Sequence, residues 1–60
     1  MTKHEAALKV MGMVEEAIKV GKYSIVREAE DIACEHGVEM GFYDDYITVE
    51  DERFDFNGAF

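Results

Sequence analysis

Cysteine and positive charge are both scarce in this 60-residue chain, and each scarcity excludes a class of protein. Cys34 is the only cysteine, so no disulfide can form within the chain. A domain this small buries only about 60% of its unfolded surface and usually needs a disulfide, a metal or a partner subunit for stability. Because the disulfide is excluded, we expect a reducing compartment, the cytoplasm, and a homodimer or permanent partner.

Patterns for metal ions, cofactors and catalysis are also missing. His4, Cys34 and His36 lack the spacing of a metal-ligand set, and the acidic turns lack that of a calcium-binding loop. There is no glycine-rich phosphate loop, and a domain of this size has little room for a catalytic pocket. We therefore expect no enzyme, no cofactor and no metal. A small metal- or ligand-binding domain ranks behind the two functional hypotheses given below.

Long apolar runs are absent as well. Lys and Glu interrupt the first twenty residues every few positions, so this segment resembles neither a signal peptide nor a membrane span. The apolar content of 48% is nevertheless too high for a disordered acidic segment. We expect residues 1–60 to fold as a single domain without a membrane partner.

The charge that is present is mostly negative. Six Lys and Arg residues stand against fourteen Asp and Glu, which gives a net charge of −8. Residues 37–60 contain one Arg and seven acidic residues. Nucleic acids and anionic membranes bind to positive patches, so we expect no direct contact with either. The helix predicted for residues 25–36 also has the wrong charge for reading DNA. A basic protein is the expected partner.

Helix signals occupy the first part of the chain. Thr2 and Glu5 have the spacing of a capping box, which predicts a helix over about residues 3–20 that ends at Gly21. Ser24 is the predicted N-cap of a second helix over about residues 25–36, which ends at Gly37.

Beyond residue 37 the apolar period changes from helical to alternating. The alternation predicts strands near residues 38–43, 46–49 and 53–56, separated by acidic turns. Val38, Met40 and Phe42 are expected on one face, and Phe54 and Phe56 are expected in the core. The predicted fold is α+β, with two helices packed on one face of a two- or three-stranded antiparallel sheet over about residues 38–57.

Apolar side chains cover about half of the first helix, although a helix that rests on a single core needs an apolar arc of only about 100°. One interpretation is that the whole arc is core. The other is that part of it meets a second copy of the chain. The candidate dimer interface consists of Leu8, Met11, Met13 and Ile18.

Acidic residues gather on the second predicted helix and in the strand region. They are more numerous than the few charges that would keep exposed strand edges from aggregating. The predicted acidic partner-binding face consists of Glu28, Asp31, Glu35, Asp44, Asp45, Glu50, Asp51, Glu52 and Asp55. Tyr43 and Tyr46 complete either the core or this contact, and the sequence leaves both interpretations open.

Carboxylates on alternate strand residues lie about 6.6 Å apart, which is similar to the separation of successive nucleic-acid phosphates. The composition is typical of the small acidic proteins with which phages and mobile elements block host enzymes, an analogy of composition alone. The first hypothesis is a non-enzymatic inhibitor that binds a basic nucleic-acid-handling protein, in one form as a nucleic-acid mimic. The alternative is a structural or adaptor module that uses the apolar first helix, with the acids serving solubility.

Overall fold

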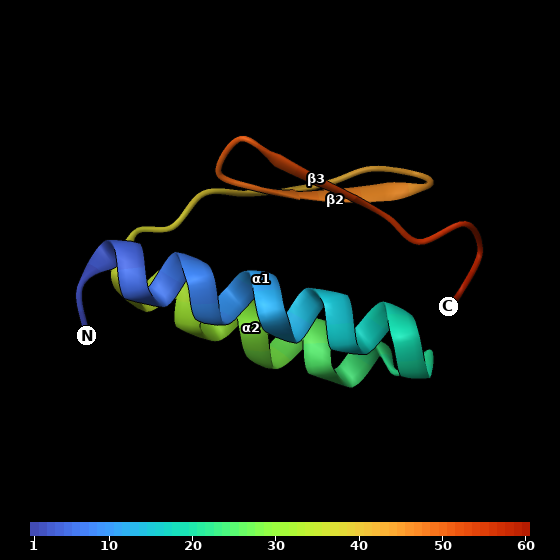
Figure 1. The fold of residues 1–60 in the computed structure, drawn as a ribbon, viewed down its shortest axis with the longest axis horizontal. Coiled ribbons are helices and arrows are strands. Elements are labelled where there is room, and N and C mark those ends of the chain that lie inside the picture. The colour runs from blue at the N-terminus through green and yellow to red at the C-terminus, as the bar shows by residue number, and fades with distance from the viewer.

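The computed structural model describes all 60 residues as two helices followed by a three-stranded antiparallel sheet (Figure 1). Helices α1 (Lys3–Val20) and α2 (Tyr23–His36) pack side by side. Strands β1 (Met40–Phe42), β2 (Tyr46–Val49) and β3 (Glu52–Asp55) lie in the order β1-β2-β3. The sheet covers one side of the helix pair, and no helix lies on its other face (Figure 1). This arrangement confirms the predicted α+β fold.

The predicted capping box forms at the start of α1. The backbone N–H of Glu5 donates to Thr2 Oγ1 at 3.1 Å, and the backbone N–H of Thr2 donates to Glu5 Oε1 at 2.8 Å. The hydrogen bond from the Thr2 backbone N–H is the main cause that lowers the pKa of the Glu5 carboxyl, and the Thr2 side chain acts in the same direction. Because the ionised carboxylate is the better acceptor, the cap stabilises the fold above the ordinary pKa of Glu and weakens as the pH falls through the lowered one.

The prediction that Ser24 caps α2 is wrong. The helix begins at Tyr23, and the residue at the N-cap position is Lys22, whose side chain makes no capping hydrogen bond. Gly21 ends α1 in the left-handed conformation, at φ 71°, so Lys22 is already extended and the next helix starts at once. Tyr23 then packs edge-to-face on Phe60, with ring centroids 5.2 Å apart. This contact joins the first turn of α2 to the last residue of the chain.

Strand boundaries differ slightly from those predicted. Strand β1 begins at Met40 rather than at residue 38, because the Val38 backbone N–H donates to the Ala33 carbonyl at 2.8 Å and so closes the end of α2. Strand β3 covers residues 52–55 instead of 53–56. Met40 and Phe42 lie opposite the inward-pointing Val49 and Ile47 and so share one face of the sheet, as predicted, although Phe42, on an edge strand, is 43% exposed.

Small aliphatic side chains form the whole buried core. Its eleven members are Ala6, Ala7, Val10, Val14, Ala17, Val26, Ala29, Ala33, Val38, Ile47 and Val49. Alanines on both helices allow the helix axes to approach closely, and Ile47 and Val49 of β2 close the core from the sheet. Phe54 and Phe56, which were expected in the core, are partly buried and pack against it from its margin. Leu8 and Val20 remain 55% and 53% exposed at the two ends of α1.

We predict that Thr2→Ala lowers the free energy of unfolding by about 1 kcal/mol at neutral pH, because the backbone N–H of Glu5 loses its acceptor. Thr2→Ser keeps a hydroxyl in place and is the matched control, with a change well below that of alanine. Urea unfolding followed by circular dichroism measures both. Equal stability of the alanine variant and the wild type would contradict a working cap at this helix end.

Candidate functional site

The register of the sheet determines which residues share its outer face, the face turned away from the helices. Ile47 and Val49 are buried toward the helices, so Tyr46 and Thr48 point outward. Residues directly opposite one another on neighbouring strands point the same way. The outer face therefore also carries Gly41 of β1 and Arg53 and Asp55 of β3.

Three side chains stack across this outer face. The rings of Tyr43 and Tyr46 are nearly parallel, 11° apart, with centroids separated by 4.5 Å. The Arg53 guanidinium carbon lies 4.0 Å from the Tyr46 ring centroid. Since β1 and β3 lie on opposite sides of β2, Tyr43 and Arg53 contact opposite faces of the Tyr46 ring. The result is a layered stack, Tyr43–Tyr46–Arg53, held by ring stacking and a cation–π contact.

Gly41, which has no side chain, leaves space for the Tyr43 ring. A Cβ atom at this position would lie 2.8 Å from Tyr43 Cε2 and 2.6 Å from Thr48 Oγ1. A side chain at position 41 would therefore require the Tyr43 ring and the Thr48 hydroxyl to shift. Tyr43 is 53% exposed, so much of its ring faces solvent beside the β1 edge. The two tyrosines thus lie on the solvent side of the sheet and form no part of the buried core.

Arg53 fixes the other end of the stack. Its Nε donates to Asp55 Oδ1 at 2.9 Å. This hydrogen bond raises the pKa of the Arg53 guanidinium, and the nearby charges of Asp55 and Asp45 act in the same direction. Asp45 belongs to the β1–β2 turn, directly before Tyr46. Arg53 is thus the one cation at the stack, and Asp44 and Asp45 make no ion pair within the chain.

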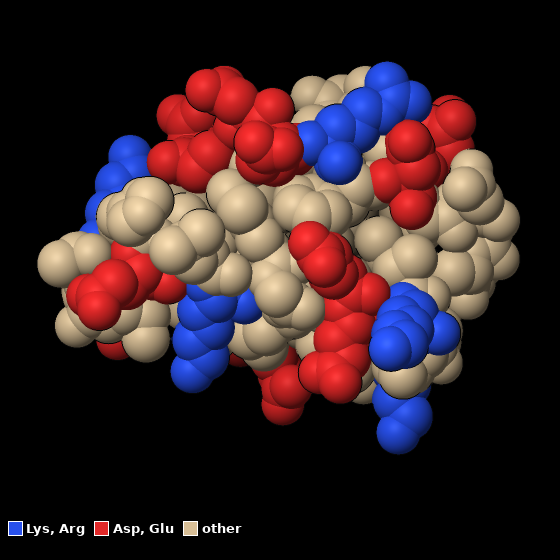
Figure 2. Space-filling view, in the orientation of Figure 1, with Lys and Arg blue, Asp and Glu red and all other residues tan.

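The nine predicted partner-binding acids fall into three separate sets rather than one face. The tyrosine-side acids are Asp44, Asp45 and Asp55; the hairpin acids are Glu50, Asp51 and Glu52; the α2 acids are Glu28, Asp31 and Glu35. The first two sets lie at opposite ends of β2, and the third lies on the side of α2 opposite its buried stripe. In Figure 2, acidic groups at the two ends of the sheet are separated by a long basic side chain.

Glu50 is already engaged in contacts within the chain. It adopts a left-handed backbone conformation, at φ 56°, in the β2–β3 turn. Its Oε2 accepts the backbone N–H of Glu39 at 3.1 Å, and its Oε1 lies 3.8 Å from Lys3 Nζ. Its own backbone N–H donates to the Glu39 carbonyl at 2.8 Å. These contacts tie the turn to the starts of β1 and α1 and offset the cost of the conformation.

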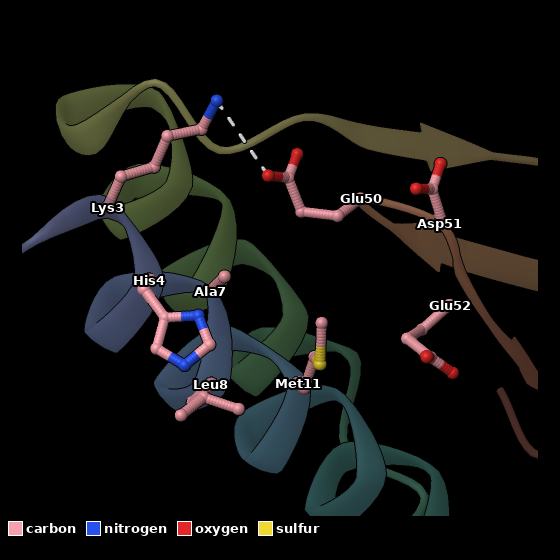
Figure 3. A pocket seen from close by; sticks show the side chains of 8 residues that line it. All are labelled: Lys3, His4, Ala7, Leu8, Met11, Glu50, Asp51 and Glu52. Carbon is pink, nitrogen blue, oxygen red and sulfur yellow. Dashed lines mark ion pairs between the residues drawn. The ribbon is translucent and has the colours of Figure 1, made fainter.

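An open hollow of about 520 Å³ lies between the start of α1 and the β2–β3 turn (Figure 3). Lys3 and His4 line one side, the hairpin acids line the other, and Ala7, Leu8 and Met11 lie between them. Of the four predicted dimer-interface residues, Leu8 is mostly exposed here. Met11, Met13 and Ile18 pack partly against the chain's own core. The structure therefore brings only Leu8 and Met11 together at this surface.

Other chemistry-bearing residues are dispersed. No three His, Cys, Asp or Glu side chains lie close enough together to hold a metal ion. Cys34 is a free, exposed thiol on α2. His36 Nδ1 lies 3.1 Å from the Ile32 carbonyl oxygen, a local contact at the end of the same helix. Neither α1 nor α2 has the length and apolar character needed to cross a membrane.

No protein-family model matches this chain, and neither a curated protein nor a solved structure is significantly similar to it.

The sequence analysis missed the part played by Arg53 and Gly41 in the tyrosine stack. The alternation of residues 46–49 is the available signal, because it places Tyr46 on the face opposite Ile47.

We predict that Gly41→Ala displaces the Tyr43 ring from Tyr46 and destabilises the fold by about 1 kcal/mol through local crowding. The loss of mutual ring-current shifts in the proton NMR spectrum reports the displacement. Gly12→Ala is the matched control, since a Cβ there meets nothing within 4 Å. It should leave the ring shifts unchanged and stabilise α1 by about 0.5–1 kcal/mol. Unchanged tyrosine shifts in Gly41→Ala would contradict the stack.

Proposed function

We propose that this protein is a non-enzymatic binding protein that engages a basic nucleic-acid-handling protein and inhibits it. The observation that carries the proposal is the outer sheet face, where the exposed Tyr43, stacked on the half-buried Tyr46, adjoins the carboxylates of Asp44 and Asp45, which form no ion pair. Tyrosine is enriched at the energetic centres of protein interfaces, and unpaired acids attract a basic surface over a distance of about a Debye length. The two features meet on the tyrosine side of the molecule.

The class of partner follows from the sign of the charge. A net charge of −8 on 60 residues favours encounter with a strongly basic surface, and nucleic-acid-binding grooves are surfaces of that kind. Because carboxylates and phosphates carry the same sign, the protein and a nucleic acid would compete for one groove. The exposed, single cysteine is in keeping with a reducing compartment, and we propose the cytoplasm.

The test is capture of binding proteins from a cell lysate on the immobilised protein, with release by a salt gradient or by duplex DNA. We predict recovery of a basic nucleic-acid-binding protein that leaves at moderate salt and is displaced by DNA. The double variant Asp44→Asn/Asp45→Asn should bind that protein about tenfold more weakly, because each screened ion pair contributes about 0.5–1 kcal/mol.

The control removes the same charge elsewhere. Glu28→Gln/Asp31→Asn lowers the negative charge of α2 by two and leaves the tyrosine side intact, so its affinity should stay within about twofold of the wild type. Equal loss in both double variants would mean that net charge alone drives binding. A partner that resists salt and is indifferent to DNA would contradict the proposal.

A second candidate function is self-association through α1, favoured by the exposed Leu8 at the hollow. The hollow has Lys3 and His4 on one wall and acids on the other, so two copies related by a two-fold axis would pair opposite charges around an apolar centre. The occupant we propose in this case is a second copy of the chain.

We predict that Leu8→Lys shifts a wild-type dimer to monomer in sedimentation velocity at micromolar concentration. Val20→Lys is the control, because Val20 is similarly exposed at the far end of the same helix. A monomeric wild type, or equal effects of the two substitutions, would contradict this candidate.

A further inference from the structure

Strand β1 presents a free edge with hydrogen-bonding groups that no other part of the chain satisfies. The backbone N–H of Glu50 donates to the Glu39 carbonyl, and that of Tyr43 donates to the Tyr46 carbonyl. Because hydrogen-bonded pairs alternate along an antiparallel ladder, Gly41 and Thr48 form the pair between them. The N–H and C=O groups of Met40 and Phe42 therefore point away from β2, toward solvent.

The two edges of the sheet differ in charge. The outward-pointing residues of β3 are Arg53 and Asp55, and charged residues of this kind prevent another strand from adding to an edge. Strand β1 consists of Met40, Gly41 and Phe42 and carries no charge. It is the edge of this sheet that an additional strand can approach.

We propose that the β1 edge receives an extended segment of the basic partner as a fourth strand, and that the segment alternates arginine with apolar residues. Every second residue of such a strand lies on the inner face, beside the partly exposed side chain of Phe42. The residues between them lie on the outer face, beside the ring of Tyr43. The residues beside Phe42 are therefore expected to be apolar, and those beside Tyr43 are expected to be arginines.

The proposed contact between a partner arginine and Tyr43 resembles one that already exists within the protein. Arg53 already lies on one face of Tyr46 and bonds to Asp55 at the β3 side of the stack. Tyr43 forms the opposite end of the same stack, with Asp44 directly after it in the chain and no cation on its free face. A partner guanidinium on Tyr43 would repeat the arrangement of Arg53 and supply the missing positive charge. This inference rests on the proposed function and names the surface and the partner chemistry for it.

The probe is a synthetic eight-residue peptide of alternating arginine and valine, with a second peptide in which citrulline replaces arginine. Calorimetry at low and moderate salt measures binding to the intact protein. We expect the arginine peptide to bind with a strong salt dependence. The citrulline peptide, which keeps the shape and loses the charge, should bind at least about tenfold more weakly.

Two pairs of variants separate the contacts. Phe42→Pro and Phe42→Ala both remove the ring, but only proline removes the outward N–H, and no ladder hydrogen bond is lost in either. Proline should weaken peptide binding about fivefold relative to alanine. Tyr43→Ala should weaken it about threefold relative to Tyr43→Phe, which keeps the ring face. Circular dichroism checks that each variant is folded. If a proline variant is unfolded, the tyrosine pair and the citrulline peptide still decide the matter.

The inference is overturned if the peptide binds equally to the proline and alanine variants, or if Tyr43→Ala matches Tyr43→Phe. It is also overturned if β1 pairs with a second copy, seen as a dimer that Phe42→Pro dissociates without peptide. The capture experiment distinguishes failure of the proposed function from failure of the added-strand inference. Capture of a basic protein that depends on Asp44 and Asp45 but not on Phe42 leaves the proposed function standing without the added strand. Loss of capture altogether removes both.

Discussion

The small side chains of the core constrain the rest of this structure. Eleven buried residues, all Ala, Val or Ile, join two helices to one face of the sheet, and within residues 1–60 no helix lies on its other face. On that outer face, Tyr43, Tyr46 and Arg53 pack on one another through ring stacking and a cation–π contact. We propose this uncovered face as the binding surface of the domain.

Charge is distributed around this framework in a way that distinguishes the three acidic sets. Of the hairpin acids, Glu50 bonds to Glu39 and lies near Lys3, so part of that set serves the fold. The α2 acids lie on the side of their helix turned away from the core, with no exposed aromatic stack among them. Only the tyrosine-side acids combine unpaired carboxylates, an exposed ring and an adjacent open strand edge. The arrangement favours recognition at one end of the sheet over a uniform negative surface.

Local signals in the sequence predict most of the fold. Thr2 with Glu5, Gly21 and Gly37 mark helix ends where the structure has them, and the change of apolar period marks the sheet. The Ser24 signal was wrong because Lys22, extended directly after Gly21, is the N-cap residue of α2. Local sequence signals also do not show which residues the fold brings together at the candidate site. Its acids were predicted as contact residues and its tyrosines as either core or contact. Their grouping depends on strand register, and the position of the Tyr43 ring depends on the absence of a side chain at Gly41.

The most direct measurement is a map of backbone amide shifts in the ¹⁵N NMR spectrum while the arginine–valine peptide is added. Binding at the proposed surface should shift residues 40–45 most, with smaller changes at Tyr46 and Arg53 and almost none along the outer side of α2. Largest shifts at Glu28, Asp31 and Glu35, or around Leu8, would contradict the assignment of the outer sheet face and its β1 edge as the binding surface.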